Sequence, residues 1–122
     1  MAGDEGTLAT TAQVLLAIGE DSSAVQVLEA NTNVWILMAE SDMESEAGSG
    51  VGLVANYSSI TASYKQWLAL VASNRAAFYA IHQGQNTWSL ATTQSKLNVI
   101  DTIWQAGRLK LKDKDVIDDM GL

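Results

Sequence analysis

Few side chains in this sequence could carry out chemistry, and His82 is the only histidine. A Ser-His-Asp triad would have to be built around this residue, and no second histidine is available to share a zinc ion. His82 falls at a predicted helix end, where a cationic ring complements the helix dipole, so a capping or packing role is favoured over catalysis. The chain has no cysteine, which excludes a cysteine nucleophile, a thiolate metal site and disulfides.

The densest group of possible metal ligands is a run of alternating carboxylates, Glu40, Asp42, Glu44 and Glu46. On a helix, residues 40 and 44 share one face and residues 42 and 46 another, and carboxylate oxygens can hold hard cations. A calcium loop also needs a tight glycine turn and converging ligands, which this run lacks. A solvated acidic helix face is therefore favoured, and no metal or cofactor is expected.

The glycine-rich stretch and the tryptophans are candidate binding elements. The glycine-rich stretch 48–52 is similar to loops that cradle phosphate, but no lysine follows it and no βαβ unit surrounds it, so a hinge or insertion loop is expected. Trp67 and Trp104 fall on predicted apolar helix stripes and are expected in the core. Trp88, in a polar turn, is the better candidate for contacting a partner.

The elements that must position these residues are predicted to be helices. Proline is absent from the 122 residues, although about six would be usual, and proline is least tolerated inside helices. Caps and apolar spacing predict four helices. The first follows Thr10 or Thr11 as its N-cap and ends before Gly19, and the others cover about residues 32–47, 61–82 and 90–112. We predict an all-α fold, a small bundle of about four helices that forms one domain over residues 1–112. The short connection between the last two helices predicts that they pack antiparallel.

The apolar spacing also predicts which side chains are buried. The core of the central and last helices is expected to contain Tyr64, Trp67, Leu68, Val71, Phe78 and Trp104. In the helix before them, the predicted buried stripe is Val34, Leu37, Met38 and Ser41. The segment 113–122 alternates charges and then offers apolar residues with little to bury them, which predicts an extended C-terminal docking arm.

The charges are divided unevenly along the chain. Residues 1–64 contain nine acidic side chains and no lysine or arginine, whereas all seven basic residues lie from Lys65 onwards. Nucleic-acid binders need a basic face, so specific binding to DNA or RNA is not expected. The acidic start also lacks the pattern of an export signal, and the apolar runs are shorter than a bilayer requires, so we expect a protein made in the cytoplasm without a membrane partner.

A spaced series of residues runs through the central segment: Asn56-Tyr57-Ser58-Ser59-Ile60, Lys65, Leu68, Ala72-Ser73, Ala76-Ala77, Ala80-Ile81 and Asn98-Val99. The series resembles the small head-to-tail connector (adaptor) proteins of tailed bacteriophages. The likeness covers about residues 8–112, including Ala12-Gln13-Val14 and Ala39-Glu40-Ser41. The chain departs from the family pattern at residues 48–52 and 85–88.

The resemblance implies a structural protein of the virion neck rather than an enzyme. Members of the family are helical bundles that form a ring, commonly of twelve copies, beneath the portal, and the ring extends the DNA channel towards the tail. It implies as partners a second copy of the chain, the portal protein and a further neck or tail protein, while DNA passes through without sequence-specific binding. By this resemblance the arm would grip the portal, through Val116, Ile117, Met120 and Leu122.

The uneven charge supports a ring on independent grounds, because an acidic first half and a more basic second half could attract each other between neighbouring subunits. Two other readings stay open. One is a different structural protein of the virion, such as a capsid decoration or tail-completion protein. The other is a helical regulator that binds a host protein.

Overall fold

The computed structural model describes residues 6–19, 26, 28–48, 50–83 and 90–122. Within these ranges the fold is all-α without strands, which confirms the predicted class. The helices are α1 (Thr11–Ile18), α3 (Glu29–Ala47), α4 (Ala62–Gln83), α5 (Leu90–Lys112) and α6 (Lys114–Asp119), with a short 3-10 turn, η1 (Tyr57–Ser59). In the part of the chain so described, no helix is both long and apolar enough to cross a membrane.

Local capping fixes the ends of α1. The Thr10 hydroxyl accepts a hydrogen bond from the Gln13 N–H at 3.2 Å, and the Gln13 side chain accepts one from the Thr10 N–H at 2.9 Å. This reciprocal capping box satisfies two backbone donors that a helix start leaves free. Gly19 ends the helix with a φ of +94°, a conformation that favours glycine. Both helix ends confirm the prediction.

Helix α3 has the predicted end at Ala47, but it starts at Glu29 and buries a different face. Val34, Leu37 and Ser41 are exposed, so the predicted stripe is wrong at these three positions. Its fourth residue, Met38, is half-buried against the core. The residues that pack inward are instead Trp35, Ile36, Ala39 and Met43. Residues 34–39 are apolar without a break, so their pattern could not select a face; the contacts of α3 with α4 and α5 select it.

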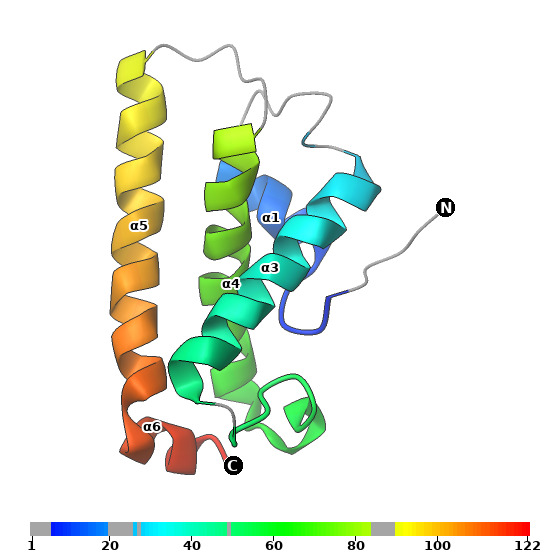
Figure 1. The fold of residues 1–122 in the computed structure, drawn as a ribbon, viewed down its shortest axis with the longest axis vertical. Coiled ribbons are helices and arrows are strands. Elements are labelled where there is room, and N and C mark those ends of the chain that lie inside the picture. Colours follow the sequence, from blue (N-terminus) through cyan, green and yellow to red (C-terminus); the bar gives the residue numbers. More distant parts are fainter. Residues whose placement is uncertain (1–5, 20–25, 27, 49, 84–89) are drawn as a thin grey trace.

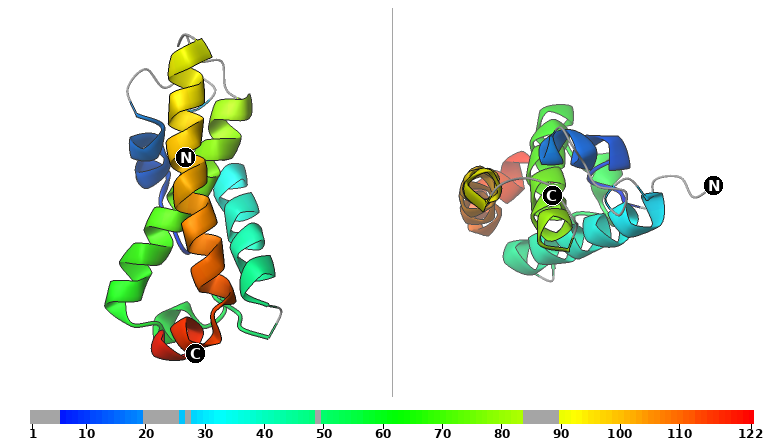
Figure 2. Two further views of the ribbon diagram at one scale, coloured as in Figure 1. Left: turned by 90° about the vertical axis from the view of Figure 1, so that its left-hand side faces the viewer. Right: turned by 90° about the horizontal axis from the view of Figure 1, so that it is seen from above.

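Helix α4 is the centre of the molecule, and α1, α3 and α5 all pack against it (Figure 1). Helices α4 and α5 run side by side in opposite directions, as predicted. Small side chains let the neighbouring helices approach α4 closely, because Ala72, Ala76, Ala77 and Ala80 are fully buried. Seen from above, α5 and α1 lie on different sides of α4 (Figure 2).

The predicted core residues divide into two groups. Leu68, Val71 and Trp104 are buried, as expected. Tyr64, Trp67 and Phe78 are only half-buried and cover the edges of the core.

The C-terminal segment is not an extended arm. After Asp113 the chain turns and forms α6, which folds back under the bundle, so that Ile117 and Met120 are buried in the same core cluster as Leu111 and Trp104. The Thr61 N–H donates a hydrogen bond to the Met120 carbonyl at 3.0 Å, which fixes the segment to the start of α4. The arm prediction is wrong because η1 and the loop before it supply an apolar surface, including Leu53 and Ile60, that the sequence pattern of the tail does not reveal.

Candidate functional site

His82 has a packing role in the last turn of α4. Its exposed imidazole lies edge-on to the Phe78 ring, with 4.5 Å between the ring centroids. This contact agrees with the packing interpretation of the sequence. Across the described ranges, no group of three or more His, Cys, Asp or Glu side chains is arranged to hold a metal ion.

The carboxylates of residues 40–46 do not form the predicted solvated face, because each one binds a different part of the chain. Glu40 is only 5% exposed, and its Oε2 accepts hydrogen bonds from the N–H groups of Thr7 and Leu8, both at 2.6 Å. Glu44 accepts one from the Val54 N–H at 3.1 Å. These two side chains hold the N-terminal segment and the loop after α3 against the bundle.

Asp42 joins α3 to α4 through Arg75. The Arg75 Nε lies 2.9 Å from the Asp42 carboxylate, and its guanidinium stacks over the Trp104 ring at 4.5 Å. The Tyr79 hydroxyl donates a hydrogen bond to the same carboxylate oxygen. Burial, followed by the hydrogen bond to Asp42, raises the pKa of the Tyr79 hydroxyl above its ordinary value.

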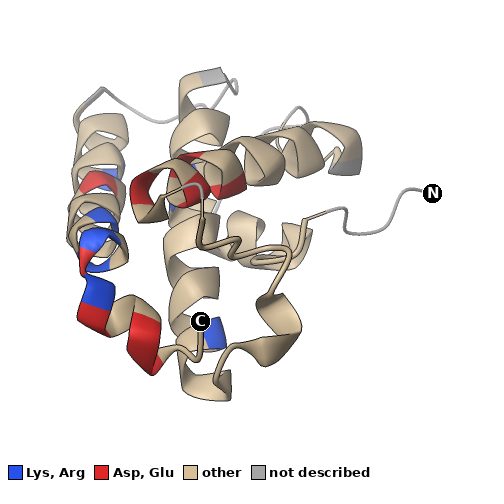
Figure 3. Ribbon diagram, turned by 60° about the horizontal axis from the view of Figure 1, so that its bottom comes forward, with Lys and Arg blue, Asp and Glu red and all other residues tan. Residues whose placement is uncertain are grey.

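Glu46 joins α3 to α5, since it lies 3.6 Å from Arg108 and 3.2 Å from Lys112. The three ion pairs of the described residues therefore all connect an acid of the first half with a base of the second half inside one subunit (Figure 3). At least part of the divided charge stabilises the subunit rather than a contact between subunits.

One concave surface lies between α1 and α4. It is a groove of about 350 Å³ lined by Gln13, Leu16, Ala17, Gln66, Ala69, Leu70, Ser73 and Asn74. None of these side chains is charged, and two large apolar ones stay exposed, Leu16 at 82% and Leu70 at 49%. A groove with this lining suits an uncharged, partly apolar surface.

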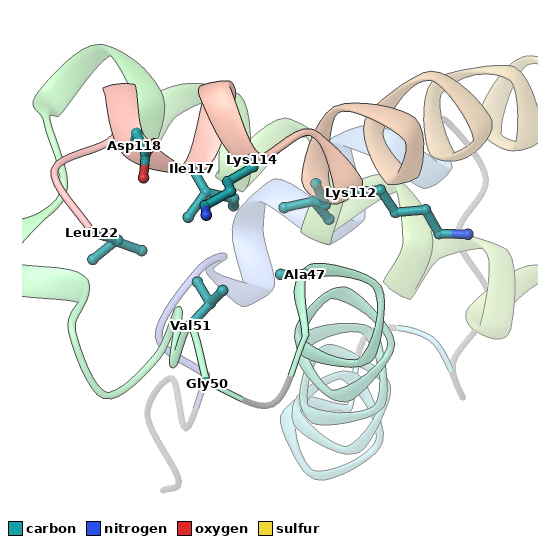
Figure 4. A pocket seen from close by; sticks show the side chains of 9 residues that line it. Ala47, Gly50, Val51, Lys112, Lys114, Ile117, Asp118 and Leu122 are labelled. Carbon is teal, nitrogen blue, oxygen red and sulfur yellow. The ribbon is translucent and has the colours of Figure 1, made fainter.

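A second cavity, of about 440 Å³, lies beneath the bundle between α6 and the glycine-rich loop. Figure 4 shows Val51 and Ile117 facing each other across it, with Leu122 at one end and the Lys112 side chain directed away. The loop takes its shape from Gly48 and Gly52, whose φ angles are +102° and +66°. It closes the lower end of the core with Leu53.

Of the predicted portal-binding residues, Ile117 and Leu122 line this cavity, and all four pack against the core instead of lying on a free arm. Ile117 and Met120 are buried, while Val116 and Leu122 are half-buried against the same cluster. Trp88, the predicted contact residue, lies outside the described residues. The sequence reading missed the groove between α1 and α4, although the apolar residues Leu16 and Leu70, which fall outside the buried stripes, were a signal for it.

Comparison with known proteins gives no relative: no family model matches the chain, and neither a curated protein nor a solved structure matches it. Function is therefore inferred from the residues and surfaces described above.

Proposed function

We propose that this protein is a head-to-tail connector, a structural virion protein that forms a ring beneath the portal of a tailed bacteriophage and extends the DNA channel towards the tail. The proposal starts from the residue series between Asn56 and Val99. In the fold, several of these residues form the buried face of α4, including Leu68, Ala72 and Ala76. The resemblance thus rests on positions that determine how the bundle packs.

The observation that carries the proposal is the apolar area left uncovered on a small subunit. Among the residues whose side chains the structure describes, seven large apolar ones are more than 40% exposed: Leu16, Leu28, Val34, Leu37, Leu70, Val99 and Leu109. They lie on or beside four different helices, and two of them line one groove. Leu16 and Leu70, which share the groove, form an uncovered apolar patch, and such a patch supports a subunit that is covered by neighbours in an assembly.

The charge of the lower end is compatible with a DNA channel. Helix α6 and its cap expose four aspartates, Asp113, Asp115, Asp118 and Asp119, beside a single lysine. An acidic surface repels phosphates, so DNA could pass it without binding. The portal contact is not assigned to residues 113–122, since Ile117 and Met120 are already used by the core.

Cryo-electron microscopy of phage particles that contain this chain tests the proposal. We expect density for it in a ring at the portal vertex, with twelve copies as the family resemblance implies. Many copies spread over the shell would support a decoration protein instead. Absence from purified particles, measured by mass spectrometry, would support the regulator reading and overturn the connector.

A further inference from the structure

The outer face of α5 has an exposed stripe without charged residues, and no described part of the subunit covers this stripe. Figure 2 shows α5 at the edge of the molecule, covered on the side that faces α4. The exposed residues of this face follow each other at helical spacing of three and four: Ser95, Val99, Thr102, Ala106 and Leu109. Val99 and Leu109 are each 62% exposed. A helix with such a stripe can pack against a further surface.

The groove between α1 and α4 is the matching concave surface. It follows α4 from Gln66 to Asn74, about 12 Å at 1.5 Å per residue, while the α5 face from Val99 to Leu109 is about 15 Å long. Charged residues number 21 in the whole chain, seven basic and fourteen acidic, yet neither surface contains one. A partner with charges at the contact would leave them buried without counter-charges, so the groove favours an uncharged occupant.

Asn74 also gives the groove a hydrogen-bond acceptor, its side-chain oxygen. Its side chain is only 7% exposed, and its amide donates a hydrogen bond to the Leu70 carbonyl at 2.8 Å. No described residue donates a hydrogen bond to the Asn74 Oδ1. Because Asn74 lines the groove, this acceptor can take a hydrogen bond from outside the subunit, either from water or from a partner side chain. On the α5 face, Asn98 carries an exposed carboxamide that can donate.

From these features we infer that α5 of one copy docks into the α1–α4 groove of the next copy, so that identical subunits associate head to tail. The two surfaces lie on different sides of α4, so they cannot meet within one subunit (Figure 2). Two different patches that complement each other make a heterologous contact, which repeats from copy to copy and can close into a ring. The inference rests on the proposed connector function, for which it supplies the contact between neighbours.

Complementation between two surface variants tests the inference. Leu109→Lys places a charge on the α5 face, and Leu16→Lys places one in the groove. Both variants are expected to fold, because each replaced side chain is exposed and lies in the last turn of its helix, where a cation is favourable to the helix dipole. Masses are measured in solution by light scattering. We expect the wild-type chain to form species larger than a dimer and each variant alone to be monomeric. An equimolar mixture is expected to form a one-to-one heterodimer, because it retains one intact α5 face and one intact groove.

The control is Ser41→Lys, a change on the exposed side of α3 that lies outside both surfaces, which should assemble like the wild type. Val99→Lys and Leu70→Lys repeat the test if either first variant fails to fold by circular dichroism. The inference is overturned if the wild type stays monomeric at about 1 mM, if the variants assemble normally, or if the mixture gives no heterodimer. If the mixed variants form a heterodimer but no ring is seen at the neck of the particle, only the connector function is overturned. If a ring is seen at the neck but the mixed variants form no heterodimer, only the proposed contact between α5 and the groove is overturned.

Discussion

Gly107 of α5 lies directly against Val71 of α4, and the absence of a side chain at position 107 sets the distance between the two helices. A Cβ atom placed on Gly107 would come within 2.8 and 2.9 Å of the two methyl carbons of Val71. Both residues are buried, so little room exists for either to move. The glycine is therefore required by packing, although it lowers the helix propensity of α5 by roughly 1 kcal/mol relative to alanine.

We expect Gly107→Ala to destabilise the protein by about 1–3 kcal/mol, because overpacking outweighs the gain in helix propensity. Denaturant unfolding measures the change. A double-mutant cycle with Val71→Ala supplies the control, since removal of the two methyl groups should make Gly107→Ala neutral or stabilising. If Gly107→Ala destabilises the wild type and the Val71→Ala variant equally, the contact with Val71 is not the cause of the destabilisation.

Glu40→Gln should release the segment before α1. The buried carboxylate accepts hydrogen bonds from Thr7 and Leu8, and loss of its charge weakens both, for an expected cost of about 1–3 kcal/mol. Hydrogen exchange should accelerate at the amides of Thr7 and Leu8. Glu44→Gln is the matched control, because it should accelerate exchange at Val54 and leave the first two amides protected. Unchanged exchange at Thr7 and Leu8 would contradict the assigned role of Glu40.

Tyr79 should make the stability fall at alkaline pH. Its pKa is raised above 10 in the folded chain, so the folded state holds this proton more tightly than the unfolded state does. The resulting stabilisation is fully present below pH 10 and is lost as the pH rises from there through the folded-state pKa. We expect the difference in unfolding free energy between wild type and Tyr79→Phe to be constant below pH 10 and to shrink above it. A difference that stays constant to higher pH would show that the hydroxyl titrates alike in both states.

Met120→Ala should cost about 2–5 kcal/mol, because the side chain is fully buried in the core cluster under α5. Thermal or denaturant unfolding gives the value. Asp119→Ala, an exposed change one residue earlier, should stay within about 0.5 kcal/mol of wild type. If the segment were a detached arm, the two substitutions would have similarly small effects.

Both ends of α1 and the end of α3 could be predicted because their signals are local. Thr10, Gly19 and Gly48 terminate helices through caps or backbone conformations that lie within a few residues of them. The inward face of α3 could not be predicted, since six consecutive apolar residues fit either orientation. The fold of residues 113–122 depends on Leu53, Ile60 and Thr61, which lie more than 50 residues earlier in the chain.

The candidate site was predictable to a smaller degree. The acidic run is visible in the sequence, but its ion-pair partners are not. Asp42 pairs with Arg75, and Glu46 pairs with Arg108 and Lys112. Spacing along a single helix cannot predict pairs between residues so far apart in the chain. Leu16 and Leu70 line one groove because α1 crosses α4, which is a property of the tertiary arrangement.

The bridges from α3 to Arg75, Arg108 and Lys112 also have a consequence for the order of events during synthesis. Translation delivers the acids of α3 well before the bases that neutralise them, and Arg108 and Lys112 follow more than 60 residues after Glu46. A nascent chain that ends before α5 therefore carries both an uncompensated negative charge and an uncovered apolar core. We expect the domain to reach its native state only when α5 has left the ribosome, as a single late step rather than helix by helix.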